Sequence, residues 1–317
     1  MISGQSLWDL FQKRTLSRRQ FIKTCVVLTG ILGLSPMAVP EVIALAEKKP
    51  LVPVIWLHGH ECTGCSESFL RSKNPLAADT ILTTISLEYN TLLSAAPGLS
   101  LEHHLEKIIQ DFAGKYLVVA EGSVPLSEGG CSCMIGGVPY VDILKTVAKQ
   151  AAAVLAIGSC ASWGGIQAAR PNPTRSVAID QIITNKPVIK IPGCPPIPEI
   201  LTSVIMNYTL FGKLPPIDHQ GRPTQFFGNT IHDTCYRKPF FEAEQFVENY
   251  GDNGSKAGWC LYKMGCRGPE TFNSCASMGW WQGLSYPIRA GSPCISCSTS
   301  GFWDNDPLTR PLEDGGV

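Results

Sequence analysis

Five short apolar runs alternate with amphipathic stretches between residues 50 and 212. The runs are almost continuously hydrophobic, which predicts strands buried on both faces at 51–57, 81–89, 115–122, 152–158 and 186–192. Between and after these runs, apolar residues recur at helical spacing near 101–112, 141–148 and 197–208. This alternation predicts an α/β fold with a doubly wound parallel sheet.

The remaining C-terminal segment, residues 213–317, has no such periodicity and is rich in Gly, Cys and aromatic residues. We therefore expect a second, smaller and irregular domain. The 317 residues are 44% hydrophobic and 16% charged, with 26 basic and 26 acidic side chains, which suits one large or two modest globular domains. The balanced charge argues against a nucleic-acid partner, and the low charged fraction favours a large apolar protein interface.

The N-terminus has the pattern of an export signal. Arg18 and Arg19, in "SRRQFIK", precede an apolar stretch that ends in small residues suited to cleavage after Ala46. The string resembles a twin-arginine signal, which implies export of a protein that has already folded and acquired its cofactors. We expect a signal at 1–46 and a mature protein in the periplasm or on the outer face of the cytoplasmic membrane. No later stretch is apolar enough to span a bilayer, so membrane attachment would need a partner.

Four of the thirteen cysteines follow predicted strands. Cys62 and Cys65 follow the first strand, Cys160 follows the fourth and Cys194 follows the fifth. Parallel strands of such a sheet bind ligands in the crevice at their carboxyl ends, so one crevice could gather the four thiols from three loops. Four thiolates could hold zinc or a 4Fe-4S cluster, and spacing alone does not separate the two. A redox-active dithiol, or disulfides of an exported protein, are further alternatives.

The C-terminal segment supplies a second set of candidate ligands. His232 stands three residues before Cys235, and Cys260 stands six residues before Cys266. Together they make a set of one His and three Cys. A lone His-x-x-Cys pair would carry little weight.

A third set consists of Cys275, Cys294 and Cys297, with Pro287 where a fourth ligand could stand. Three thiolates without an obvious fourth ligand suit a 3Fe-4S cluster. Zinc would need a water as its fourth ligand, and nothing nearby resembles a hydrolytic site. Three ligand sets in one chain therefore favour iron–sulfur clusters over zinc.

These motifs, in this order, resemble the small, electron-transferring subunit of uptake-type nickel-iron hydrogenases. The resemblance covers essentially the whole mature chain and rests on "ECTGCSESF", "EGSVP", "GSCASWGG", "NPT", "PGCPP", "IHDTCYRKP", "CLYKMGCRGP" and "GFWD". It implies a flavodoxin-like domain at 47–212 with a proximal 4Fe-4S cluster. It also implies a C-terminal domain at 213–317 with a distal 4Fe-4S and a medial 3Fe-4S cluster.

The same resemblance implies the ligands of each cluster. It assigns the proximal cluster to Cys62, Cys65, Cys160 and Cys194, the distal cluster to His232, Cys235, Cys260 and Cys266, and the medial cluster to Cys275, Cys294 and Cys297. Pro287 takes the position that denies the medial cluster a fourth thiolate. Glu121 is implied to lie near the proximal cluster, although it could instead only cap a turn. His58 and His60 flank the first cysteine pair and receive no role.

The resemblance implies that a partner subunit carries the chemistry. A large subunit would split H2 at a nickel-iron centre, and this chain would conduct the electrons through its three clusters to a cytochrome b or another iron–sulfur or cytochrome acceptor. The chain has the two Cys-x-x-Cys pairs that a four-thiolate nickel site needs. However, Cys294/Cys297 lacks the preceding Asp-Pro and the following His of the large-subunit pattern. We therefore expect no nickel on this chain.

The chain departs from the pattern of this family at two places. Some oxygen-tolerant relatives carry extra cysteines where this chain has Gly64 and Gly165, so we expect an ordinary proximal cluster. Cys131 and Cys133 lie outside the family's ligand set and could be free thiols, a disulfide or a redox pair.

Two alternative functions remain. One is a complex I-like quinone-linked subunit, which typically has adjacent cysteines and no cluster-rich second domain. The other is an exported zinc or disulfide protein.

Overall fold

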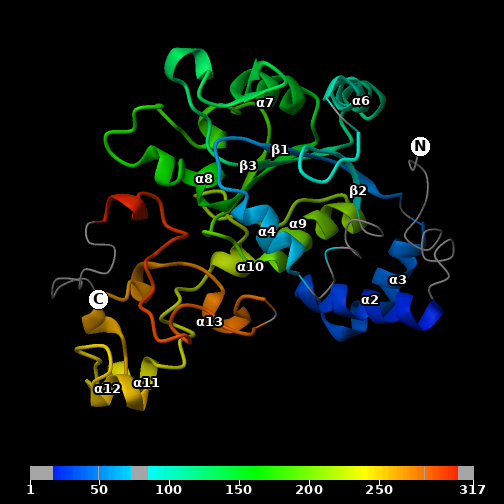
Figure 1. Ribbon diagram of the computed structural model, residues 1–317. Coiled ribbons are helices and arrows are strands. Elements are labelled where there is room, and N and C mark those ends of the chain that lie inside the picture. Colours follow the sequence, from blue (N-terminus) through cyan, green and yellow to red (C-terminus); the bar gives the residue numbers. More distant parts are fainter. Residues whose placement is uncertain are drawn as a thin grey trace.

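The computed structural model describes residues 17–48, 50–72, 77, 85–96, 98–281 and 283–305. Its centre is a five-stranded parallel sheet in the order β2-β1-β3-β6-β7 (Figure 1). The strands are β1 (Val52–His58), β2 (Ile85–Asn90), β3 (Leu117–Glu121), β6 (Ala153–Ile157) and β7 (Val188–Ile191). Counted along the sheet, this is the flavodoxin-like order 2-1-3-4-5. All five predicted strands are confirmed, although residues 81–84 of the second prediction lie outside the described residues.

Helices cover both faces of the sheet. The helices α6 (Gly98–Asp111) and α7 (Tyr140–Lys149) lie on one face, and α4 (Gly64–Leu70), α9 (Pro198–Phe211) and α10 (Thr224–Phe227) lie on the other (Figure 1). Successive residues of β1 alternate between the two cores: Val54 and Trp56 join the α9 side, whereas Ile55 and Leu57 join the α7 side. Burial on both faces explains the continuous hydrophobicity of the strands, and the doubly wound prediction is confirmed.

The C-terminal segment is built from short elements and turns, as its composition predicts. It contains α11 (Lys238–Glu242), α12 (Asn253–Ala257), α13 (Cys275–Met278) and the 3-10 helices η6 (Tyr262–Met264), η7 (Gly268–Glu270) and η8 (Phe302–Asp304). Its buried Val247, Cys275 and Ile288 belong to the same hydrophobic cluster as Ile191 of β7 and Leu201 of α9. The segment therefore packs directly against the α9 side of the sheet.

Short elements also occupy the loops of the first part. They are α8 (Gly158–Trp163), the hairpin of β4 (Met134–Ile135) and β5 (Val138–Pro139), and the 3-10 helices η3 (Ser127–Gly130), η4 (Ile166–Ala168) and η5 (Ile179–Gln181). Two of them, α8 and η4, lie at the carboxyl edge of the sheet next to predicted ligands.

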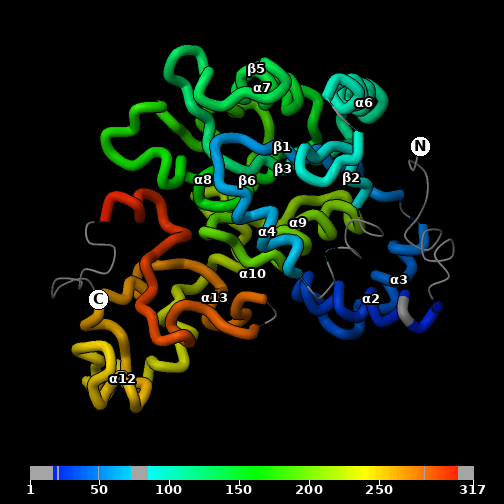
Figure 2. The backbone as a smooth tube through the Cα atoms, in the orientation of Figure 1, coloured from blue at the N-terminus to red at the C-terminus, as the bar shows by residue number. Residues whose placement is uncertain are grey.

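The predicted signal forms a helical hairpin on the body of the protein. Helices α2 (Arg18–Ile31) and α3 (Val39–Lys48), joined through η1 (Pro36–Ala38), pack on α9 and bury Phe21 and Leu28 against Met206 (Figure 2). The first 16 residues of the predicted signal lie outside the described residues. Among the helices that the structure describes, none combines the length and apolarity needed to cross a membrane.

Candidate functional site

The first group of candidate ligands lies at the carboxyl edge of the sheet. The chain leaves β1 at His58, turns through Thr63 in the left-handed region (φ 61°), and enters α4, so Cys65 lies in the first helical turn. Cys160 also lies in a helix, because α8 begins at Gly158 directly after β6. The expectation that these cysteines all lie in loops is therefore wrong for Cys65 and Cys160. Gly158 has a φ of +83°, which permits the abrupt change from strand to helix.

The four thiols of this group lie together. Cys65 experiences the charges of Cys62, Cys160 and Cys194, and its burial is the main reason that its pKa is raised well above the usual value. Burial likewise raises the pKa of Cys160 to about 12. The raised pKa values of Cys65 and Cys160 favour their protonated form, so binding iron would displace these protons.

Glycines keep space free beside these sulfurs. A Cβ at Gly158 would lie 2.4 Å from the Cys65 Sγ, and one at Gly165 would lie 2.5 Å from the Cys160 Sγ. A Cβ at Gly64 would lie 3.2 Å from the Cys62 Sγ. Gly64 and Gly165, the two glycines singled out in the sequence, thus directly adjoin predicted ligands.

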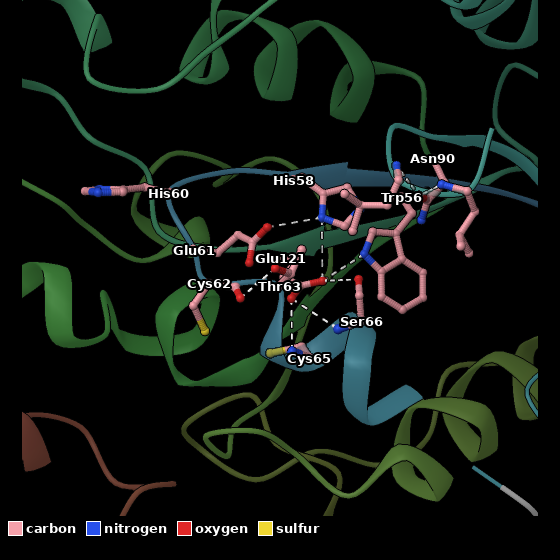
Figure 3. Close-up of polar contacts among 12 residues, drawn as sticks. Trp56, His58, His60, Glu61, Cys62, Thr63, Cys65, Ser66, Asn90 and Glu121 are labelled. Atoms are coloured by element: carbon pink, nitrogen blue, oxygen red, sulfur yellow. Dashed lines mark hydrogen bonds and ion pairs between the residues drawn. The ribbon is translucent and has the colours of Figure 1, made fainter. Parts of the chain in front are cut away.

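Glu121 ends β3, beside β1 at the point where the strand order reverses, and is 1% exposed. Its Oε1 accepts hydrogen bonds from the backbone N–H groups of Cys65 (3.0 Å) and Ser66 (3.2 Å). Its Oε2 accepts from the Ser66 hydroxyl (2.6 Å) and the Trp56 indole N–H (3.1 Å; Figure 3). The carboxylate therefore caps the first turn of α4, the turn that contains the predicted ligand Cys65.

Sequence reasoning missed His58, which belongs to the same buried network. Its ring stacks on Trp56 with centroids 6.3 Å apart, and its Nδ1 lies 3.3 Å from the Glu61 Oε1 and 3.7 Å from the Glu121 Oε2. Within the described residues, the buried His58 Nε2 has no hydrogen-bond partner. Its position at the carboxyl end of a buried strand was the available signal. His60 points away from this network in Figure 3.

The second group surrounds a cavity in the C-terminal segment. All four predicted ligands of this group line it; they are His232, Cys235, Cys260 and Cys266. Burial and then the nearby Lys238 lower the pKa of His232, which favours the neutral ring that a metal needs. Burial raises the pKa of Cys260 to about 11.

The third group lines a neighbouring cavity. Cys275, Cys294 and Cys297 lie in its wall together with Pro287. Burial raises the pKa values of Cys275 and Cys297 to about 12 each. The proline therefore stands at this cavity, where a fourth ligand would have to lie.

Hydrogen bonds connect the three groups in a row. The Ser159 hydroxyl, next to Cys160 of the first group, donates to the Cys297 carbonyl oxygen of the third group. The backbone N–H of Cys294, in the third group, donates to the Cys266 Sγ of the second group at 3.4 Å. The third group therefore lies between the other two.

The arrangement of the thiols differs from that of a single-ion site. Over the part of the chain that the structure describes, no three His, Cys, Asp or Glu side chains converge closely enough to hold one metal ion. All thirteen cysteines lie in this part, and none of them forms a disulfide. The side chains of the second and third groups instead line the walls of two pockets. Cys131 is exposed beside Glu128, and Cys133 lies near Glu61, outside all three groups.

Two family models match the two parts of the chain. Residues 227–309 match the C-terminal domain of NiFe/NiFeSe hydrogenase small subunits. Residues 62–208 match the 20 Kd subunit of NADH ubiquinone oxidoreductase.

Known proteins match almost the whole chain. The chain is 50% identical to the uptake hydrogenase small subunit of Azotobacter vinelandii over 95% of its length and 84% of that protein. It is 46% identical to the hydrogenase-1 small chain of Escherichia coli K12 over 96% of its length and 82% of that chain. Among solved structures, the reduced, active Ni-Fe-Se hydrogenase from Desulfomicrobium baculatum matches with a TM-score of 0.77 and 29% identity, covering 83% of this chain and all of that one.

Proposed function

Because the chain belongs to the nickel-iron hydrogenase small-subunit family, we propose that its three side-chain groups hold the three iron–sulfur clusters of an electron-transfer path. As a member of that family it is the electron-transferring half of a hydrogenase heterodimer, and the large subunit holds the nickel-iron site. The observation that carries the proposal is the row of three thiol-lined sites, in contact through hydrogen bonds between neighbouring groups.

The ligand assignment follows the grouping of the side chains. The proximal 4Fe-4S cluster takes Cys62, Cys65, Cys160 and Cys194; the distal 4Fe-4S cluster takes His232, Cys235, Cys260 and Cys266; and the medial 3Fe-4S cluster takes Cys275, Cys294 and Cys297. Pro287 in the wall of the third cavity supports a medial cluster that lacks a fourth protein ligand.

The protein supplies the environment in which electrons move. Iron–sulfur clusters, when bound, accept and release single electrons at potentials set by their surroundings. Glu121 holds the backbone of Cys65 through buried hydrogen bonds and thus fixes the orientation of its thiolate. The buried Cys294 and the hydrogen-bond contacts between neighbouring groups exclude water and keep the sites close together.

The direction of the row indicates where the partners bind. We propose that electrons from H2 oxidation at the large subunit enter through the Cys62–Cys65 group and leave through the group of His232. The exit lies near the surface, because Tyr236, next to the ligand Cys235, is 49% exposed. A cytochrome b, or another iron–sulfur or cytochrome protein, is the proposed acceptor there.

The N-terminal hairpin fits a twin-arginine signal on a folded precursor and thus a periplasmic mature protein. Arg18 and Arg19 are exposed at the start of α2, where an export receptor could read them. Ala46, the proposed cleavage position, is 2% exposed and lies within α3. Cleavage would therefore require α3 to leave α9. N-terminal sequencing of the exported protein tests this, and a mature chain that still begins before residue 18 would refute it.

Iron and acid-labile sulfide analysis of the purified heterodimer, combined with EPR, tests the cluster proposal. We expect eleven iron atoms in the small subunit, four in each of two clusters and three in the medial one. The oxidised enzyme should show a 3Fe-4S signal, and the reduced enzyme should show interacting 4Fe-4S signals. A colourless, iron-free or zinc-containing small subunit in a folded heterodimer would refute the proposal.

The complex I-like alternative rests on the family match of residues 62–208, which covers the flavodoxin-like half alone. That half would hold a single cluster. This alternative assigns no cluster to the two C-terminal cavities, which are lined by His232 and by Cys275. An enzyme with one 4Fe-4S cluster and no 3Fe-4S signal would favour it.

A further inference from the structure

Tyr286 lies in the wall between the second and third cavities. Its side chain is 2% exposed and lines the cavity of Cys294, while its hydroxyl lies beside the Cys235 sulfur of the other cavity. Ile288, two residues on, lines both cavities. One phenol therefore contacts both the proposed medial site and a proposed distal ligand.

The hydroxyl of Tyr286 has no conventional partner. Among the described residues it is a buried polar atom without a hydrogen bond of good geometry, and the Cys235 thiol is the group within its reach. Two other tyrosines are satisfied in the ordinary way: the Tyr116 hydroxyl donates to the Val147 carbonyl oxygen, and the Tyr236 hydroxyl donates to that of Ile288. A buried hydroxyl without a hydrogen-bond partner needs an explanation. One explanation is that a group bound at this site changes a neighbouring side chain into its partner.

A thiolate at Cys235 would satisfy this hydroxyl. When the thiol gives up its proton to bind iron, its sulfur becomes a charged acceptor, and hydrogen bonds to charged acceptors are the strong ones. The Cys235 Sγ already accepts a hydrogen bond from the backbone N–H of Arg237, with 3.4 Å between the nitrogen and the sulfur. The guanidinium of Arg289 lies 5.5 Å from the centroid of the Tyr286 ring and helps to hold the ring in place.

We propose that Tyr286 is a positioning residue that donates a hydrogen bond to the Cys235 thiolate and thereby raises the reduction potential of the distal cluster relative to the medial one. Reduction adds negative charge to the cluster and its sulfurs, so a hydrogen-bond donor stabilises the reduced state more than the oxidised state. The result favours electron flow outward from the medial site. The inference rests on the proposed role of Cys235 as a distal ligand.

The test is Tyr286→Phe in the complete heterodimer, which keeps the ring in the wall and removes only the hydroxyl. EPR-monitored redox titration should show that the equilibrium constant for reduction of the distal cluster falls about tenfold. This corresponds to a fall in its midpoint potential of ~59 mV for a one-electron couple. The medial midpoint should stay unchanged. Tyr116→Phe, which also removes a buried hydroxyl but lies in the sheet domain, is the matched control and should shift neither midpoint.

A distal midpoint that is unchanged or higher in Tyr286→Phe, or an equal shift in Tyr116→Phe, would overturn the inference and leave the ligand assignment intact. Absence of any distal 4Fe-4S signal in the unmodified heterodimer would instead overturn the assignment of Cys235 and the inference with it.

Discussion

Glu121 offers the sharpest test of how the fold holds the first cysteine pair. Its carboxylate is 1% exposed and accepts hydrogen bonds from four donors, three N–H groups and the Ser66 hydroxyl. Glu121→Gln keeps one carbonyl oxygen for the backbone of Cys65 and Ser66 but places an amide NH2 opposite the other two donors. The Ser66 hydroxyl can rotate and accept from this NH2, whereas the Trp56 N–H can only donate.

The two substitutions at Glu121 should therefore differ in size. Gln leaves one buried donor unpaired, which costs about 1–3 kcal/mol of stability. Ala leaves four neutral donors without their acceptor, and at the lower end of about 1–3 kcal/mol for each unpaired buried donor this costs roughly 4 kcal/mol. At roughly 2–4 °C per kcal/mol for a domain of this size, the Tm should fall by about 6 °C for Gln and about 12 °C for Ala.

The assay is thermal unfolding of the purified heterodimer, followed by far-UV circular dichroism and by the visible absorbance of the clusters. Glu67→Gln is the matched control, because Glu67 lies on the same helix but its side chain is 57% exposed and pairs with Arg71 at the surface. Such a pair is worth about 0–1 kcal/mol, so this Tm should change by no more than about 3 °C. If Glu121→Ala is as stable as Glu67→Gln, or Glu121→Gln is as stable as the unmodified enzyme, the hydrogen-bond reasoning is wrong.

Three further predictions concern the cluster sites. Pro287→Cys places a thiol in the wall of the medial cavity, so the oxidised 3Fe-4S EPR signal should be lost as a 4Fe-4S cluster forms; an unchanged signal would show that Pro287 does not control the cluster type. Gly158→Ala puts a Cβ 2.4 Å from the Cys65 Sγ, so iron content should fall by about one cluster per heterodimer. Full iron content in that variant would contradict the close approach. The double substitution Cys131→Ser and Cys133→Ser should retain all the iron, because both thiols lie outside the three groups; any loss of iron would mean that the ligand assignment is incomplete.

Sequence patterns anticipated most of the fold. The continuous apolar runs located all five strands, and helical periodicity located α6, α7 and α9, because burial on one or two faces imposes a local repeat on the residue order. The carboxyl-end rule also brought Cys62, Cys160 and Cys194 to one edge of the sheet. It did not anticipate that Cys160 lies in a helix, since Gly158 allows α8 to begin without any loop after β6.

The family resemblance located groups that spacing alone left open. His232 and Cys266 are 34 positions apart in the sequence, and no periodic signal links them, yet they line one cavity. The family resemblance assigned no role to either His58 or His60. Only the packing shows that the ring of His58, the last residue of β1, lies on Trp56 and faces Glu121, whereas His60, beyond the end of the strand, points away.

The sequence by itself determined the kind of fold and the family, and it predicted a set of ligand residues in each motif. These follow from local order: burial patterns and short spacings are set within a few residues of each other. The tertiary structure alone decided how the groups meet. Glu121 bonds to Cys65 across 56 positions, Cys294 to Cys266 across 28, and Tyr286 reaches Cys235 from another turn of the chain. Such contacts depend on how strand order and core packing bring distant segments together, which local residue order does not encode.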